Sequence, residues 1–212
     1  DKLCLYYRTF NGTTAAVEFK LTRKIVTDEA SGISAKIGVD QALKVEPITS
    51  GGKYILAKRN IEKGYDAKVL DISILEGDKE VALEEPLTFS MKLDPDSVFD
   101  GTVKVNHLKI TTLEEIPSTF KDGILTFDDR LSKEVILTYE PKLYGDVNRD
   151  LTVDISDALV TLQKSVGLVE FDEKQTILAD VDGSEGVTVS DALAVLQYAV
   201  GIVDNLPKVN LK

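Results

Sequence analysis

Hydrophobic and polar residues alternate along much of the first two thirds of the chain. In "PLTFSMKL", every second residue from Leu87 to Leu93 is apolar and the residues between are polar, as in a strand with one buried face. Other short stretches are rich in β-branched or aromatic residues and are bounded by turn formers: "AAVEFKL", "YILAKR", "VLDISIL", "TVKVNHLKI", "ILTF" and "EVILTYE". Roughly nine such strands, with no long helical period among them, predict an antiparallel β-sandwich.

The pattern changes its period after Gly145. Apolar residues then recur at helical spacing and form two stripes: Ile155, Leu159, Leu162 and Val166, then Val189, Leu193, Leu196 and Val200. Gly167 and Gly201 follow the stripes, and glycine commonly ends a helix. We expect two helices that pack antiparallel, with both apolar stripes inside.

The two helical segments belong to copies of one unit. "GDVNRDLTVDISDALVTLQKSVG", starting at Gly145, returns 34 residues later as "ADVDGSEGVTVSDALAVLQYAVG", starting at Ala179. Of the 23 aligned positions, 11 are identical and no gap is needed, which indicates an internal duplication.

Oxygen-bearing residues at alternate positions open each copy. The four carboxylates of the first copy would repel one another unless a cation lay between them. Ca²⁺ takes about six to eight oxygen ligands, and a twelve-residue loop that runs into a helix can supply them. The pattern therefore predicts two Ca²⁺ ions, with Thr152 and Gly186 contributing backbone carbonyls. The expected ligands are Asp146, Asn148, Asp150, Thr152, Asp154 and Asp157 in the first loop, and Asp180, Asp182, Ser184, Gly186, Thr188 and Asp191 in the second. The alternative is a solvated acidic turn that caps a helix.

The two loops are not equivalent. The sixth position of a calcium loop usually carries Gly, because the backbone there is left-handed. Leu151 occupies this position in the first loop and Glu185 in the second, with Gly186 one place later. Four carboxylates against three predict that the first loop binds Ca²⁺ more tightly.

The composition of the chain argues against several classes of function. A net charge of −11 argues against nucleic-acid binding, which needs Lys and Arg against the phosphates. Single Cys and His residues, Cys4 and His107, predict neither an internal disulfide nor a thiolate or histidine metal site. The apolar runs are too short to insert into a membrane, and any export signal was removed or lay upstream. The patterned carboxylates are assigned to calcium and no nucleophile motif is present, so we expect no enzyme activity.

At the two loops the sequence resembles the dockerins, the calcium-dependent modules of cellulosome-type assemblies. The resemblance rests on duplicated D-x-N/D-x-D/S loops that end in Asp, each followed by one helix, over residues 144–206. Only "DEKQTILA" gives a short helix ahead of the second loop. The resemblance implies a small all-α dockerin domain over residues 142–212. It also implies that this domain binds a cohesin on a scaffoldin or a cell-surface anchoring protein.

Residues 1–141 resemble the immunoglobulin-like β-sandwich X modules that precede dockerins in bacterial surface proteins. This resemblance implies a secreted or cell-surface protein of a polysaccharide-degrading complex, in which the sandwich acts as a spacer or stabiliser. A carbohydrate-binding module is the alternative for this domain, because Tyr6 with Tyr7, or Tyr54 with Tyr65, could stack on sugars.

The flank of the two helices beside the apolar stripes is the surface we expect to contact the partner. It comprises Ser156, Val160, Gln163 and Lys164 on the first helix and Ser190, Ala194, Gln197 and Tyr198 on the second. Tyr is enriched and Lys depleted in the centres of interfaces, so we expect Tyr198 at the centre and Lys164 at the rim. We also expect Tyr144 to stack on Pro207.

Overall fold

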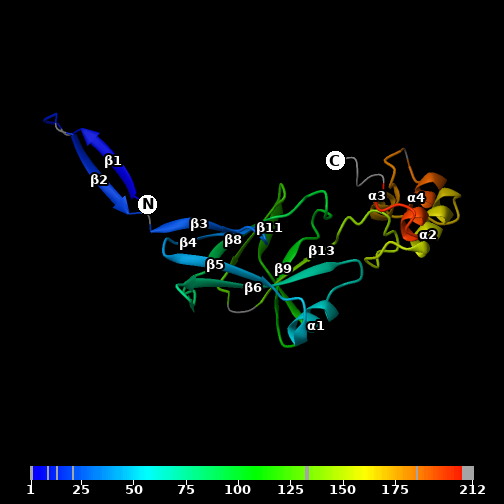
Figure 1. The fold of residues 1–212 in the computed structure, drawn as a ribbon, viewed down its shortest axis with the longest axis horizontal. Helices are drawn as coiled ribbons and strands as arrows, with labels where there is room; N and C mark the ends of the chain where they lie inside the picture. The colour runs from blue at the N-terminus through cyan, green and yellow to red at the C-terminus, as the bar shows by residue number, and fades with distance from the viewer. Residues whose placement is uncertain are drawn as a thin grey trace. The chain divides into compact units, whose positions relative to one another are not determined.

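The computed structural model describes residues 2–8, 10–12, 14–20, 22–131, 134–184 and 186–206 of the 212-residue chain (Figure 1). The described residues are mostly β-sheet, in two antiparallel sheets and one separate hairpin, with four short helices. The chain divides into two compact units. The first unit comprises residues 1–57, 68–93 and 104–137, and the second unit comprises residues 58–67, 94–103 and 138–212.

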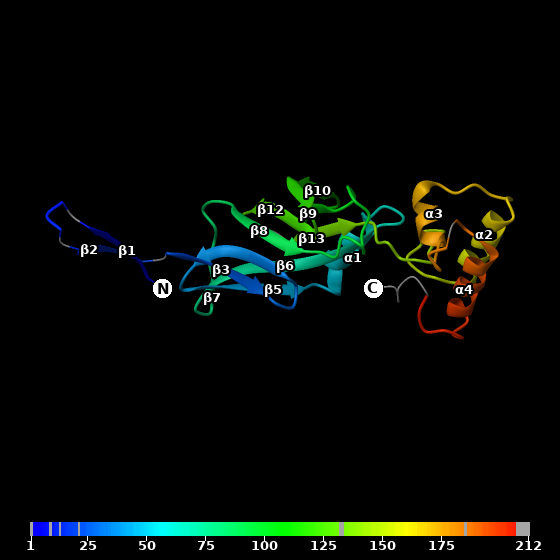
Figure 2. The ribbon, with the colours of Figure 1, turned by 90° about the horizontal axis from the view of Figure 1, so that it is seen from above.

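One sheet has five strands in the order β11-β12-β8-β4-β3. Figure 2 labels three of them, β3, β8 and β12. The strands are β3 (Arg23–Asp28), β4 (Ile33–Gly38), β8 (Leu87–Lys92), β11 (Ser118–Lys121) and β12 (Ile124–Asp129). The alternation read from the sequence holds on β8, where Phe89 and Met91 are buried and Thr88 and Lys92 are exposed. Phe89 lies opposite Phe127 of β12, and the two rings stack with their centroids 5.5 Å apart.

The other sheet follows the order β10-β9-β13-β6-β5, with β7 paired to β6. Its strands are β5 (Gln41–Pro47), β6 (Asp66–Glu76), β7 (Lys79–Glu80), β9 (Lys104–Leu108), β10 (Leu113–Ile116) and β13 (Val135–Tyr139). Leu70, Ile72 and Ile74 of β6 are buried, as the sequence pattern predicts. Apolar residues are also buried on the other sheet, so the expected sandwich is consistent with this part of the chain.

Two segments differ from the strand prediction or add to it. "YILAKR" lies in a helix, α1 (Gly51–Arg59), and not in a strand. Its last turn carries Lys58 and Arg59, which are favourable beside the carbonyl end of a helix dipole. Within the part of the chain that the structure describes, strands β1 (Lys2–Arg8) and β2 (Thr14–Lys20) pair only with each other, as a two-stranded hairpin.

The predicted small all-α dockerin domain over residues 142–212 is wrong. Helices α2 (Ile155–Ser165), α3 (Glu173–Ala179) and α4 (Val189–Ala199) do not form a unit of their own, because the second unit also contains residues 58–67 and 94–103.

Backbone pairing joins residues 94–103 to the segment just before the repeat. Lys142 donates its N–H to the carbonyl of Ser97 at 2.9 Å, and Phe99 donates to the carbonyl of Glu140 at 3.0 Å. An antiparallel bridge also pairs Val98 with Pro141. The helical periodicity of the sequence predicts the helices themselves. It does not predict that residues 58–67 and 94–103, which are distant in sequence, belong to the same unit.

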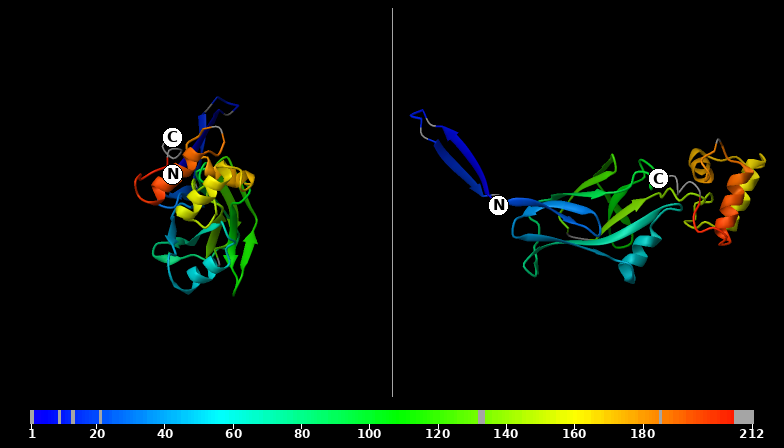
Figure 3. Two further views of the ribbon diagram at one scale, coloured as in Figure 1. Left: turned by 90° about the vertical axis from the view of Figure 1, so that its right-hand side faces the viewer. Right: turned by 45° about the horizontal axis from the view of Figure 1, so that its top comes forward.

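The interior of the second unit also differs from the prediction. Helices α2 and α4 pack side by side (Figure 3), but the buried cluster consists of Ala158, Val181, Val195 and Leu206, with Tyr144, Val153 and Ala194 packed against it. All eight residues of the predicted interior stripes are exposed instead: Ile155, Leu159, Leu162, Val166, Val189, Leu193, Leu196 and Val200.

The buried Asp157 and Asp191 explain this orientation of the helices. Each carboxylate must point inward to reach the backbone N–H groups of its own loop. A residue two places away on an α-helix lies about 200° around the axis, so Leu159 and Leu193 turn outward.

Candidate metal centre and docking surface

The carboxylate of Asp157 closes the first loop. Its Oδ1 accepts hydrogen bonds from the backbone N–H groups of Val147 and Asn148, each at 2.9 Å. Its Oδ2 accepts from the N–H of Asp154 at 3.0 Å. A residue on α2 therefore binds both ends of the loop that precedes its helix.

Asp146 binds the middle of the same loop. Its two carboxylate oxygens accept from the backbone N–H groups of Asp150 and Leu151, at 3.0 and 2.9 Å. Burial raises the pKa of both Asp146 and Asp157, and the charge of Asp150 raises each pKa further, against the lowering effect of the backbone hydrogen bonds. The first loop thus holds carboxylates in a setting that favours a bound cation or a proton.

The second loop repeats this arrangement. Asp191 Oδ1 accepts from the N–H groups of Val181 and Asp182, and Oδ2 accepts from Thr188 N–H and Oγ1. Carboxylate oxygens of Asp180, Asp182 and Asp191 all lie within 4.8 Å of one another. These are the first, third and twelfth positions of the predicted calcium loop.

The remaining predicted ligands shape the loops and begin the helices. Asp154 caps α2 and Thr188 caps α4, and each accepts a hydrogen bond from the N–H of the Ser two residues later. Asp150 accepts from Thr152 N–H at 3.0 Å, and its counterpart Ser184 donates its N–H to Asp182 Oδ1 at 2.8 Å. Among the described residues, the structure thus brings together the carboxylates of Asp180, Asp182 and Asp191 in the second loop, whereas the four carboxylates of the first loop form no such cluster.

Two residues of the first loop have the left-handed backbone conformation. Leu151, at the sixth position of the first loop, has φ 71°, and Arg149 has φ 59°. In the second loop the positive φ values belong to Gly183 and Gly186, while Glu185 lies outside the described residues. A non-glycine residue held in this region costs about 1–2 kcal/mol, so the first loop stores strain at two places.

One buried side-chain oxygen of the first loop has no hydrogen-bond partner. Asn148 occupies the third loop position, where the second loop has Asp182. Its Nδ2 donates to Ser156 Oγ at 3.2 Å, but its Oδ1 is buried with no hydrogen-bond partner. Buried oxygens without partners are rare, and a cation would satisfy this one. Carboxylate, amide and carbonyl oxygens are the donors that Ca²⁺ prefers.

A continuous apolar surface covers the exposed side of α2 and α4. It forms a groove of about 300 Å³ lined by Ile155, Ala158, Leu159, Leu162, Val189, Ala192, Leu193 and Leu196. We call these eight residues the stripe surface; six of them are exposed, and Ala158 and Ala192 are buried, each 5% exposed. Large exposed apolar patches on proteins mark sites of interaction.

The predicted partner residues lie beside the stripe surface in varied settings. Ser156, Ser190 and Tyr198 are exposed, while Val160, Gln163, Lys164, Ala194 and Gln197 are half-buried. Ala194 packs against the buried cluster of the second unit. Lys164 binds Glu170 at 2.7 Å and lies over the ring of Phe171.

Two further predictions concern aromatic residues. Tyr144 packs against the buried cluster, and Pro207 lies outside the described residues, so their stacking stays a prediction. Tyr6 and Tyr7 are both exposed on β1, but adjacent residues of a strand point to opposite faces. They therefore do not form one platform for a sugar. Tyr54 and Tyr65 are half-buried.

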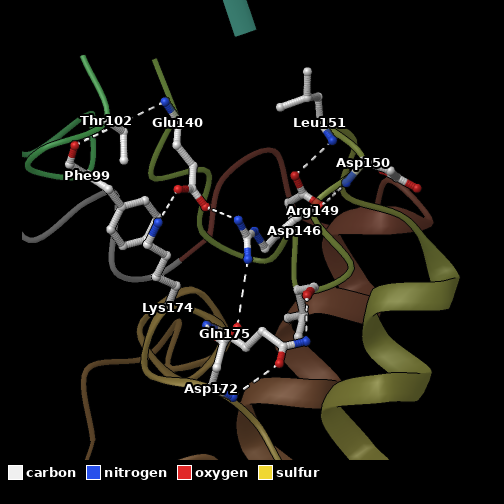
Figure 4. Close-up of polar contacts among 11 residues, drawn as sticks. Phe99, Thr102, Glu140, Asp146, Arg149, Asp150, Leu151, Asp172, Lys174 and Gln175 are labelled. Atoms are coloured by element: carbon white, nitrogen blue, oxygen red, sulfur yellow. Dashed lines mark hydrogen bonds and ion pairs between the residues drawn. The ribbon is translucent and has the colours of Figure 1, made fainter. Parts of the chain in front are cut away.

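A charged cluster that the sequence patterns do not predict lies next to the first loop (Figure 4). Glu140 is 1% exposed, and its carboxylate pairs with Arg149 at 2.5 Å and with Lys174. We call these three residues the Glu140 cluster. One signal was available: Arg149 stands where the second copy has Gly183.

No family model matches the chain, and no curated protein matches it either. Among the helices of the described residues, none has the length and apolar character needed to cross a membrane.

Proposed function

We propose that the chain is a calcium-dependent docking module of the dockerin kind. Its partner would be a cohesin module of a scaffoldin or of a cell-surface anchoring protein, in an extracellular assembly that degrades polysaccharides. Residues 1–141 would act as a spacer or stabiliser, and we assign no catalytic role to the chain.

The observation that carries this proposal is the position of the stripe surface relative to the calcium loops. The Asp154–Asp157 and Thr188–Asp191 capping pairs join each loop to the first turn of α2 or α4. A cation held by either loop would therefore fix the start of the helix that presents one half of the apolar groove. Binding of the metal would in this way prepare the surface for the partner.

The ligands would be the twelve residues expected from the sequence, of which Asp157 lies on α2 and Asp191 on α4. Bound Ca²⁺ would neutralise the carboxylates and hold the loop ends together. Asp157 and Asp191 already accept backbone hydrogen bonds from residues nine and ten positions earlier, so each would connect the ion to its loop.

Calorimetric titration of the full chain against a panel of cohesins, with Ca²⁺ and with excess chelator, tests the proposal. We expect binding to at least one cohesin only in the presence of Ca²⁺. The double variant Leu159→Ser/Leu193→Ser should weaken this binding by at least a hundredfold while leaving calcium binding intact. Ile110→Ser, at an exposed apolar residue of the first unit, is the matched control. No binding to any cohesin, or binding that ignores the chelator, would refute the proposal.

A further inference from the structure

Glu140 joins the first calcium loop to parts of the chain outside the repeat. Its backbone N–H donates to Thr102 Oγ1 at 3.1 Å, and its carbonyl accepts from Phe99 N–H at 3.0 Å. Its side chain binds Arg149, at the fourth position of the first loop, and Lys174 on α3 (Figure 4). One residue therefore connects residues 94–103, the loop and the helix between the two copies.

Because Glu140 is buried, its carboxylate depends on these contacts for its stability. A buried carboxylate is stable only when cations or donors surround it, and removal of one partner leaves an uncompensated charge. Glu140 is 1% exposed, and its cationic partners come from the first loop (Arg149) and from the helix between the two copies (Lys174). The positions of Arg149 and Lys174 are therefore tied to that of Glu140.

Arg149 occupies a place where the backbone disfavours it. It has φ 59°, and the equivalent residue of the second loop is Gly183, with φ 72°. Glycine adopts this conformation without strain, whereas arginine does not. Strained residues persist where their surroundings hold them, and here the ion pair with Glu140 supplies the restraint.

Neighbouring segments enclose the two cations. A Cβ atom on Gly64 would lie 3.2 Å from Nε of Arg149, so the segment of residues 58–67 passes directly over this side chain. Arg149 Nη1 also lies 3.7 Å from a carboxylate oxygen of Asp172. Lys174 Nζ lies 5.2 Å from the centre of the Phe99 ring.

The second loop has no equivalent arrangement among the described residues. Gly183 carries no side chain that could reach a buried acid, and Asp182 and Asp191 bind within their own loop. The restraint that Glu140 exerts through Arg149 thus acts on the first loop.

From these contacts we infer that Glu140 is a positioning residue that orders the first calcium loop before the metal arrives. It acts through Arg149 and holds the backbone of residues 149–151, whose N–H groups at 150 and 151 bind Asp146. This inference rests on the proposed calcium binding. According to this inference, residues 94–103 and Glu140, which lie outside the repeat, help to form the first calcium site but not the second.

Calcium titrations of single-site backgrounds of the full chain test the inference. Asp191→Ala leaves the first loop as the metal site, and Asp157→Ala leaves the second. In the Asp191→Ala background, Glu140→Gln should weaken Ca²⁺ binding about tenfold or more, and in the Asp157→Ala background less than twofold. Glu170→Gln, which removes an exposed partner of Lys164, should change neither value. Equal weakening of both loops, or no weakening of the first, would overturn the inference.

Arg149→Gly gives a second and independent test, because it converts the residue to that of the other loop and removes backbone strain. If the side chain only fills space, this variant should bind Ca²⁺ as well as before or better. We expect at least a fivefold loss at the first loop, and faster hydrogen exchange of the N–H groups of Asp150 and Leu151 in the metal-free chain. Unchanged exchange and unchanged affinity would contradict the inference. Failure of the unmodified chain to bind Ca²⁺ would instead refute the proposed function.

Discussion

The carboxylate of Asp157 accepts a hydrogen bond of 2.9 Å from the backbone N–H of Val147, ten residues earlier. Asp191 and Val181 repeat this contact at the same distance in the second copy. The last acidic residue of each loop therefore already closes the loop through its own oxygens. A bound cation would add its own contacts to these backbone hydrogen bonds, which already close each loop.

Replacement of these two aspartates should separate the two sites. In Asp157→Asn, an amide N–H₂ group would replace one oxygen that accepts from backbone N–H donors, and one negative charge would be lost. We expect at least tenfold weaker Ca²⁺ binding at the first loop, and the same at the second for Asp191→Asn. Because the first loop has four carboxylates, Asp157→Asn should lower the melting temperature of the calcium-loaded chain more. Calorimetry and thermal melts measure both effects, and the reverse order would contradict the ranking.

The start of the first loop has no room for a side chain. Gly145 has φ 93°, and a Cβ there would lie 2.8 Å from Leu206 Cδ1 and 2.9 Å from Val153 Cγ1. Gly145→Ala should therefore lower the free energy of unfolding by about 2–4 kcal/mol, through overpacking and backbone strain together.

Gly167→Ala is the matched control for that variant. Gly167 has φ 76°, but nothing lies within 4 Å of its Cβ position, so only strain of about 1–2 kcal/mol is expected. Chemical denaturation of the calcium-loaded variants measures the difference. Equal losses would show that Leu206 and Val153 move aside without resistance.

The acid dependence of the metal-free chain should be opposite to that of an ordinary salt-bridged aspartate. Burial raises the pKa of Asp146 and Asp157, so the folded state binds protons at a higher pH than the unfolded state. These two groups therefore stabilise the metal-free fold as pH falls toward their raised pKa values, and this stabilisation is lost as pH rises. Calcium affinity should change in the other direction, because protons compete for the same oxygens.

Thermal melts in excess chelator at pH values from about 7 to about 4.5 measure this effect. On acidification, the unmodified chain should gain stability relative to Asp146→Asn, which lacks one of the two groups. A difference between the two chains that stays constant with pH would contradict the expected protonation.

One tyrosine should ionise late. Burial, followed by the charge of Asp66, raises the pKa of Tyr139 to about 12, and its hydroxyl lies 3.4 Å from Asp66 Oδ2. Since the unfolded state loses this proton near pH 10, stability should fall as pH rises from about 10 to about 12. Ultraviolet titration should show a last ionising tyrosine that Tyr139→Phe removes. The variant should also lose less stability than the unmodified chain over this range.

The elements that the sequence predicts well are those whose residues alternate or repeat locally. "PLTFSMKL" and "VLDISIL" lie in β8 and β6, and the repeat places α2 and α4 correctly. "YILAKR" lies in α1, because its last four residues are strong helix formers and four apolar residues in six do not distinguish the two periods. Local pattern is a weak guide for such short stretches.

The orientation of the helices could not be read from hydrophobicity. The most apolar stripe points outward, and the small residues Ala158 and Ala192 are buried beside the inward-pointing Asp157 and Asp191. Burial of a charged carboxylate is unfavourable by itself, so the sequence pattern gives no reason to expect Asp157 and Asp191 inside. The backbone N–H groups of the loops, which bind these carboxylates, make their burial favourable. The sequence pattern also does not predict the Glu140 cluster, because Glu140 and Lys174 are 34 positions apart in sequence and only the fold brings them together.

The buried cluster of the second unit has a thermodynamic consequence. Ala158 belongs to the first copy, Val181 and Val195 belong to the second, and Leu206 follows both. Because these side chains pack in one buried cluster, the ordering of either copy provides the apolar surface against which the other copy packs. Part of the conformational entropy lost when the first ion binds is then no longer lost when the second binds. Calcium uptake should accordingly be cooperative, with a steeper saturation curve than that of two independent sites.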